Sequence, residues 1–154
     1  MPKVAIILGS ASDKPVGEEA LPYLNYFNIE AEIHIMSAHR TPDKVQKFAE
    51  SAREQGYEAI IAGAGLAAHL PGVVAAFTTL PVIGVPLSAG SLNGLDSLFS
   101  IVQMPAGVPV ATMAIGKPGM RNAAIFAAQI LSIKYPELEE KLTEFKANEC
   151  KLPQ

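Results

Sequence analysis

A long stretch of this sequence is almost without charge. Between residues 59 and 116 the only residue with a formal charge is Asp96. Glycines and prolines interrupt the stretch too often for a membrane-spanning helix, which needs about 20 consecutive apolar residues. Near-continuous apolar runs are instead typical of parallel strands that helices bury on both faces. We therefore expect an α/β protein, with part of this stretch buried against other copies of the chain in a homo-oligomer.

Composition excludes several other classes of protein. The 154 residues, 49% of them hydrophobic, suit one domain spanning residues 1–154. The net charge is −3 and the Lys and Arg residues are scattered, so no surface for nucleic acid is indicated. The N-terminus lacks the pattern of a signal peptide, and we expect a cytoplasmic protein without membrane partners. Cys150 is the only cysteine, which excludes an intrachain disulfide and a cysteine-based metal site.

Strand-like and helical patterns alternate along the chain. Five apolar runs predict strands at residues 4–8, 29–36, 57–62, 81–85 and 108–114. The patterns between and after them predict helices: one capped by Asp13 and kinked at Pro22, one from Thr41 to Gly56, and others at residues 73–77, 95–102, 122–133 and beyond Pro136. This order is typical of a flavodoxin-like fold, a three-layer α/β/α domain with a doubly wound parallel sheet of about five strands and here a C-terminal helix.

Three polar loops follow the first three predicted strands, at residues 9–13, 37–40 and 63–69. In doubly wound sheets, ligands bind outside the carboxyl ends of the strands. We therefore expect these loops to converge on one rim and to form a site. The second strand alternates apolar and polar residues, which indicates an edge strand whose His34 faces solvent rather than a ligand.

The first loop, Gly9-Ser10-Ala11-Ser12-Asp13, offers backbone amides, two hydroxyls and a helix N-terminus, a combination that binds phosphate. It matches neither the Walker A nor the GxGxxG pattern, and a simple capped turn is the alternative. Asp13 would repel a phosphate, so in a ligand site it suits ribose hydroxyls.

The second loop contains His39 and Arg40 at the start of a helix, where the cation and the helix dipole both favour an anion. Imidazole exchanges protons near neutral pH, so His39 is a candidate general acid and base. On spacing alone, His39 and His69 could equally be structural residues bonded to backbone. For Asp96 we favour a helix cap or buried anchor over a catalytic role. Gln103 and Met104 could reach either a ligand or a neighbouring subunit, and the sequence does not decide between them.

Five motifs in register resemble one family. They are GSxSD, SAHRTP, GAGxAAHLPG, DSLxSIVQMP and AIGxxGxxNAA, and together they run from about residue 4 to residue 131. This combination is similar to the bacterial N5-carboxyaminoimidazole ribonucleotide mutases of purine biosynthesis, the PurE family. The resemblance implies a flavodoxin-like fold, a homo-octamer with sites at subunit junctions, and an isomerase that acts on a small ribonucleotide without metal or cofactor.

The resemblance also implies a role for each site residue. His39 would be the catalytic acid and base, while an apolar loop would confine carbon dioxide between its release from the exocyclic nitrogen and its capture at ring carbon C4. Ser10, Ser12, Ser37 and Arg40 would hold the 5′-phosphate, and Asp13 the ribose. The predicted substrate-binding residues are Gly9, Ser10, Ser12, Asp13, Ser37, Ala38, Arg40, Ala64, Gly65, Leu66, Ala67 and His69.

Two positions depart from the family pattern. Leu66 stands where a third glycine is usual, and residues 88–91 differ from a commoner run that contains glutamine. A related branch carboxylates aminoimidazole ribonucleotide directly, but it typically carries a lysine in place of Arg40 and lacks the AHLPG segment, so the resemblance favours the mutase. A non-enzymatic nucleotide- or flavin-binding module is a third possibility that the fold would permit.

Overall fold

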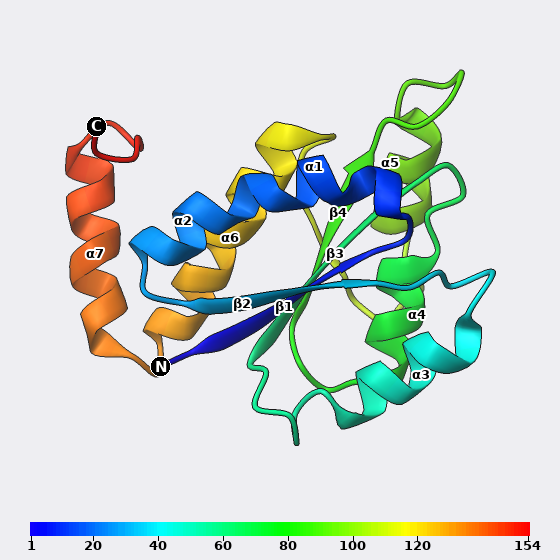
Figure 1. Ribbon diagram of the computed structural model, residues 1–154, viewed down its shortest axis with the longest axis horizontal. Coiled ribbons are helices and arrows are strands. Elements are labelled where there is room, and N and C mark those ends of the chain that lie inside the picture. Colours follow the sequence, from blue (N-terminus) through cyan, green and yellow to red (C-terminus); the bar gives the residue numbers. More distant parts are fainter.

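The computed structural model describes residues 1–154 and contains a parallel five-stranded sheet in the order β2-β1-β3-β4-β5 (Figure 1). This is the flavodoxin-like order expected from the sequence. The strands are β1 (Lys3–Leu8), β2 (Glu30–Ile35), β3 (Ala59–Gly65), β4 (Val82–Leu87) and β5 (Ala111–Thr112). The helices are α1 (Lys14–Gly17), α2 (Leu21–Tyr26), α3 (Pro42–Ser51), α4 (Leu70–Phe77), α5 (Leu95–Val102), α6 (Lys117–Ser132) and α7 (Pro136–Ala147).

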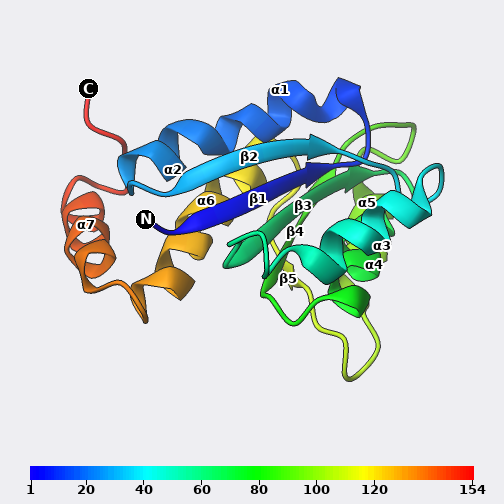
Figure 2. The ribbon, with the colours of Figure 1, turned by 60° about the horizontal axis from the view of Figure 1, so that its bottom comes forward.

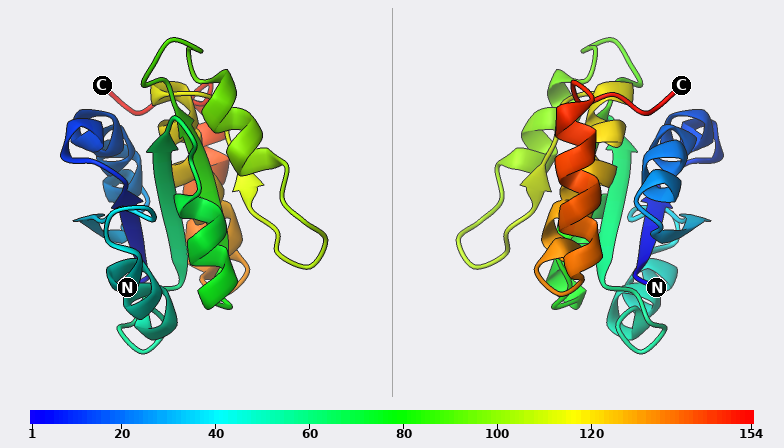
Figure 3. Two further views of the ribbon diagram at one scale, coloured as in Figure 1. Left: turned by 90° about the vertical axis from the view of Figure 1, so that its right-hand side faces the viewer. Right: turned by 90° about the vertical axis from the view of Figure 1, so that its left-hand side faces the viewer.

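Helices cover both faces of the sheet, as Figures 2 and 3 show. Alternate strand residues face opposite sides, so Val4 and Ile6 of β1 belong to a core under α1, α2, α6 and α7, whereas Ala5 and Ile7 belong to a core under α3, α4 and α5. The central strands β1, β3 and β4 are buried on both faces, which accounts for much of the charge-poor sequence. None of the helices has the length and apolar character needed to cross a bilayer.

The segment after β1 bends as Pro22 predicted. Two short 3₁₀ turns, Ala11–Asp13 and Glu18–Ala20, flank α1, and the second separates it from α2. Pro22 has no N–H to donate to the carbonyl of Glu18, which instead accepts from Leu21 in a tighter turn. Asp13 occupies the N-cap position of α1 as predicted, but its side chain makes no capping bond, and Ser10 caps the first 3₁₀ turn by accepting the Ser12 N–H.

Several predicted boundaries move. α4 begins at Leu70 rather than at residue 73, and α6 begins at Lys117 rather than at residue 122. β5 has two residues instead of seven, although the N–H groups of Met113 and Gly116 still donate to β4. Proline limits the strand at both ends, because Pro109 lies two residues before it and Pro86 lies two residues beyond Gly84, its last partner in β4, and neither proline has an N–H for a regular ladder.

β2 is the edge strand that the alternation predicted, but His34 is not simply solvated. Its Nε2 lies 2.9 Å from the Tyr57 hydroxyl, which donates to Glu32, and Lys3 Nζ lies 2.8 Å from the other Glu32 oxygen. The hydrogen bonds from Lys3 and then Tyr57 lower the pKa of Glu32, while burial and then Glu32 raise the pKa of Tyr57. This network ties the edge strand to β1 and to Tyr57, which lies just before β3.

Candidate functional site

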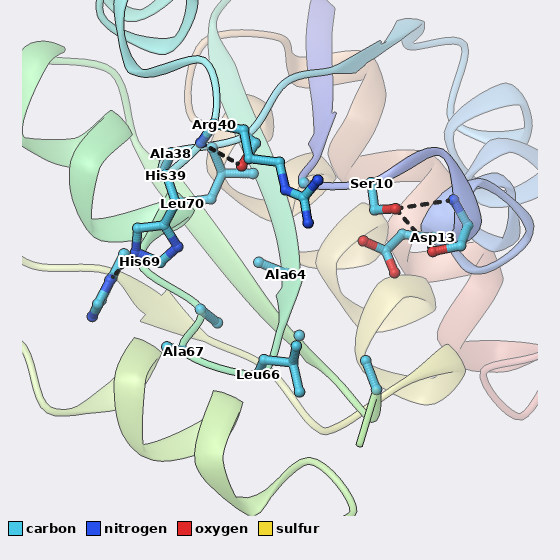
Figure 4. Close-up of a pocket in the computed structure, with 16 residues that line it drawn as sticks. Ser10, Asp13, Ala38, His39, Arg40, Ala64, Leu66, Ala67, His69 and Leu70 are labelled. Carbon is cyan, nitrogen blue, oxygen red and sulfur yellow. Dashed lines mark hydrogen bonds between the residues drawn. The ribbon is translucent and has the colours of Figure 1, made fainter.

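The three polar loops converge on one cavity of about 620 Å³ outside the carboxyl ends of β1, β2 and β3 (Figure 4). All 13 residues predicted for the site are among the 16 that line it: Gly9, Ser10, Ser12, Asp13, Ser37, Ala38, His39, Arg40, Ala64, Gly65, Leu66, Ala67 and His69. The structure adds Ala68, Leu70 and Ala89. Ala89 lies in the 88–91 run whose departure from the family pattern was the only signal for it.

The first loop presents hydroxyls and one carboxylate to the cavity. The Ser10 and Ser12 hydroxyls are 2.9 Å apart, and Ser10 also accepts the Ser12 N–H at 3.3 Å. Asp13 is half-buried, and burial raises its pKa against the opposing effect of a backbone hydrogen bond from Ser10. Its carboxylate therefore lies beside two hydroxyls in a partly desolvated corner, an arrangement that suits binding of further hydroxyl groups.

The second loop is closed by its own side chains. The Ser37 hydroxyl accepts the Arg40 N–H at 3.1 Å, and the Thr41 hydroxyl accepts the Ser37 N–H at 2.9 Å. Thr41 precedes α3 and Pro42 begins it, as predicted, but the Thr41 hydroxyl bonds to Ser37 instead of capping the helix. This closed turn fixes the backbone between the strand and the helix, so that His39 and Arg40 project outward.

His39 contacts His69 directly, a pairing that spacing in the sequence could not reveal. The His39 Nε2 lies 2.5 Å from the His69 Nδ1, and the ring planes meet at 84°. One nitrogen must donate and the other accept, because two N–H groups cannot occupy the same gap. The pair therefore links the second polar loop to the loop after β3 through one shared hydrogen bond.

Arg40 is a cation without an internal partner. None of the seven ion pairs in the structure includes it. Figure 4 shows its guanidinium extending from the second loop toward Ser10 and Asp13. An exposed guanidinium facing serine hydroxyls and backbone amides forms a natural site for a phosphate or another anion.

The predicted Gly63–Gly65 loop is instead the end of β3, since Ala64 and Gly65 pair with Pro86 and Leu87. Packing rather than a turn requires glycine here: a Cβ on Gly65 would lie 2.6 Å from the Ala89 Cβ. The loop therefore starts at Leu66, which has a φ of 55° and a side chain 54% exposed at the cavity.

Gln103 and Met104 have different surroundings in the structure, since only Met104 lines a cavity. Met104 lines a second, mainly apolar cavity of about 460 Å³ that shares Ala38, His39 and His69 with the first. Its thioether packs so closely on Gly72 that a Cβ there would lie 3.1 Å away. Gln103 is exposed and lines neither cavity. The His39–His69 pair therefore lines both cavities, the first with polar and apolar residues and the second mainly apolar.

Asp96 lies outside the site, and the expectation that it is a cap or buried anchor is wrong. It is half-exposed in the first turn of α5 and makes no capping bond. Its neighbour Ser97 is the buried anchor, because the Ser97 hydroxyl lies 2.8 Å from the Leu87 carbonyl and 2.9 Å from that of Gly94. Cys150 is an exposed free thiol near the C-terminus.

Curated relatives cover most of this chain. A Thermotoga maritima protein named N5-carboxyaminoimidazole ribonucleotide mutase is 61% identical over 95% of this chain and 84% of its own length. A Pyrococcus abyssi protein of the same name is 58% identical over 95% of this chain and 83% of its own length. The Bacillus subtilis protein of the same name is 56% identical over 96% of this chain and 91% of its own length. These relatives confirm the resemblance predicted from the five motifs.

A solved structure agrees with the sequence relatives. The crystal structure of Treponema denticola PurE superposes with a TM-score of 0.87 at 28% identity, covering 97% of this chain and 92% of that one. A 3-dehydroquinate dehydratase-like protein from Bifidobacterium longum, with a TM-score of 0.54 and 17% identity, shares the fold alone. The family model described as AIR carboxylase matches residues 3–151. The chain therefore belongs to the AIR carboxylase family.

Proposed function

We infer that this chain is an isomerase of purine biosynthesis that converts N5-carboxyaminoimidazole ribonucleotide to 4-carboxy-5-aminoimidazole ribonucleotide. Its curated relatives carry the mutase name at 56–61% identity. The observation that carries the assignment to a site is the convergence of serine hydroxyls, a free guanidinium and an imidazole pair on one 620 Å³ cavity. A ribonucleotide with a phosphate at one end and a reacting base at the other fits this distribution of groups.

The polar side of the cavity suits the ribose phosphate. We place the 5′-phosphate against Ser10, Ser12, Ser37 and Arg40, where hydroxyls, amides and a cation meet. Asp13 then accepts hydrogen bonds from the ribose hydroxyls. The base and its carboxylate lie along the end of β3 and the following loop, where Gly9, Ala38, Ala64, Gly65, Leu66, Ala67 and His69 form the wall.

His39 carries the proton in the proposed reaction. It protonates the exocyclic nitrogen of the carbamate, the N–C bond breaks with its electron pair remaining on nitrogen, and carbon dioxide is released. Ring carbon C4 then attacks the carbon dioxide to form a C–C bond, and neutral His39 removes the C4 proton. The proton that His39 takes from C4 replaces the one that it gave to nitrogen. The cycle therefore consumes no external acid or base and needs no metal or cofactor.

The experiment that tests this function compares two substrates at low bicarbonate. We expect the synthetic carbamate to be converted to the 4-carboxy product without added carbon dioxide. A requirement for added carbon dioxide, with no turnover of the carbamate, would instead identify a direct carboxylase. Binding of mononucleotides without any turnover would identify a non-enzymatic module.

Replacing Arg40 by alanine tests the phosphate site. We expect the Michaelis constant to rise about 10- to 100-fold with a smaller change in kcat, since charge-assisted hydrogen bonds to the phosphate are lost in both ground and transition states. Arg53→Ala is the matched control, because Arg53 donates to Thr79 at 3.0 Å and lines no part of this cavity. An unchanged Michaelis constant in Arg40→Ala would remove Arg40 from the phosphate site.

We also propose that the protein is a cytoplasmic homo-octamer with its sites at subunit junctions, as the family resemblance implies. The support within the chain is the outer face of α5, where Leu95, Phe99 and Val102 are 49%, 56% and 47% exposed at helical spacing. Such a face is typical of a subunit contact.

Light scattering should give a mass about eight times the 16.3 kDa of one chain. Phe99→Asp should reduce that mass, because the new carboxylate would be buried in the contact. Ile133→Asp, at a position 90% exposed beyond α6, should leave it unchanged. A monomeric wild-type protein would contradict the proposal.

A further inference from the structure

Leu66 adopts a backbone conformation that its side chain disfavours. Five non-glycine residues have positive φ, and Leu66, at 55°, is the aliphatic one. The others are Asn28 and Asn93, which tolerate this conformation, and Glu149 and Cys150 near the C-terminus. Leu66 also lines the cavity with its side chain 54% exposed. A strained backbone and an exposed apolar group at one position point to a function rather than to folding.

The Leu66 side chain reaches the neighbouring loop. A Cβ on Gly90 would lie 2.7 Å from the Leu66 Cδ2, so the absence of a side chain at Gly90 provides the space that Leu66 uses. One residue before Leu66, a Cβ on Gly65 would lie 2.6 Å from the Ala89 Cβ, so these two backbones also approach closely. The loop after β3 and the loop after β4 therefore meet at two consecutive positions, and Leu66 spans the gap between them at the cavity wall.

Leu66 and the polar groups lie on different sides of the cavity. In the view of Figure 4, Leu66 lies on the opposite side of Ala64 from Arg40, and Ala67 follows it toward His69. The wall that continues from Leu66 includes Ala67, Ala68 and Leu70 together with Ala89, and His69 is the one polar side chain in this run. This side suits an uncharged, apolar species better than it suits a phosphate.

We propose that Leu66 is a positioning residue that closes the apolar wall and retains carbon dioxide between its release and its capture. The inference rests on the proposed mutase function. Carbon dioxide is uncharged and held by no covalent bond after the N–C bond breaks, so its escape competes directly with attack by C4. An aliphatic side chain that bridges two loops narrows the exit and excludes water, and the cost of its left-handed backbone is offset by that use.

The test is a labelling experiment on the full-length protein. The synthetic carbamate carries ¹⁴C in its carboxyl group, unlabelled bicarbonate is present, and the label retained in the 4-carboxy product is measured after subtraction of a blank without protein. We expect the wild type to retain most of the label and Leu66→Ala to release about tenfold more per turnover, the scale of losing aliphatic contacts in a pocket. Ile133→Ala, which removes another exposed aliphatic side chain, should retain label like the wild type.

Two further variants separate the side chain from the backbone. Leu66→Gly should release label like Leu66→Ala but melt about 2–4 °C higher than it, because glycine relieves the positive φ that alanine keeps. Gly90→Ala should displace the tip of Leu66 and increase release in the wild-type background, yet change nothing in the Leu66→Ala background. Purely additive effects of Gly90→Ala and Leu66→Ala would overturn the contact between the two loops as the cause.

The outcomes distinguish this inference from the function on which it rests. If the wild type makes no 4-carboxy product from the carbamate, the mutase function fails. If the wild type turns over and Leu66→Ala retains label equally well, the function stands and the role of Leu66 is refuted.

Discussion

Replacing His39 by asparagine removes turnover while leaving the fold and substrate binding nearly intact. His39 is exposed and its ring bonds only to His69, so little packing is lost. Asparagine can still donate and accept hydrogen bonds but cannot carry a proton between nitrogen and C4. The loss of a general acid and base lowers kcat by about 10²- to 10⁴-fold. Steady-state kinetics on the carbamate, with circular dichroism and ligand-binding measurements on the same sample, check this result.

A second imidazole supplies the matched control. His34 bonds to Tyr57 on the edge strand and lines no part of the cavity, so His34→Asn should keep kcat close to the wild-type value. His69→Asn should lower kcat less than His39→Asn does, because His69 shares the proton in the pair without carrying it to substrate. Wild-type-like turnover in His39→Asn, or a larger loss in His69→Asn, would refute the assignment of His39.

Gly119→Ala destabilises the protein more than any other single added methyl group that we consider. An ideal Cβ at this position would lie 1.6 Å from the carbonyl oxygen of Ala114 and 2.6 Å from its carbonyl carbon. Both contacts are with backbone, so no side chain can rotate away, and the first turn of α6 must shift. We expect the free energy of unfolding to fall by about 3 kcal/mol or more, and the melting temperature by roughly 6–12 °C.

The steric clash in Gly119→Ala should also disturb the sheet, because Gly119 lies next to a buried core residue. Gly119 is followed by Met120, which is fully buried and whose Cε would lie 3.2 Å from a Cβ on Gly63 of β3. Movement of α6 therefore reaches the strand that ends at the cavity. Gly107→Ala is the control: it has open space around it, and its φ of 103° is the only penalty. Chemical denaturation should show a loss in Gly107→Ala of about 1 kcal/mol, and an equal loss in the two variants would contradict the steric argument.

The local signals in the sequence are enough for the order of the elements. Apolar runs and helical spacing predicted five strands and the helices between them, and the bounds of α5 are those predicted. The edge position of β2 followed from its alternation of apolar and polar residues, because only one of its faces is covered. The convergence of the three polar loops followed from parallel topology, which brings the carboxyl ends of the strands to one edge.

The predictions from glycine were wrong where glycine serves close packing instead of a turn. Gly63 and Gly65 suggested a loop because glycine commonly marks turns, yet here they are glycine because Leu8, Met120 and Ala89 leave no room for a side chain. Gly119 has the same cause within α6. Close packing between distant segments cannot be read from the identity of one glycine, since the partner atoms are far away in the chain.

By itself the sequence determined the α/β class, the family through its five motifs, and the identity of most residues around the cavity. Those properties depend on periodicity and on neighbours within a few positions along the chain. Only the tertiary structure decided that His39 touches His69 across 30 positions, that Arg40 has no carboxylate partner, and that Leu66 occupies the space left by Gly90. These contacts depend on where the ends of separate strands come together, and that is set by packing of the two cores on either side of the sheet.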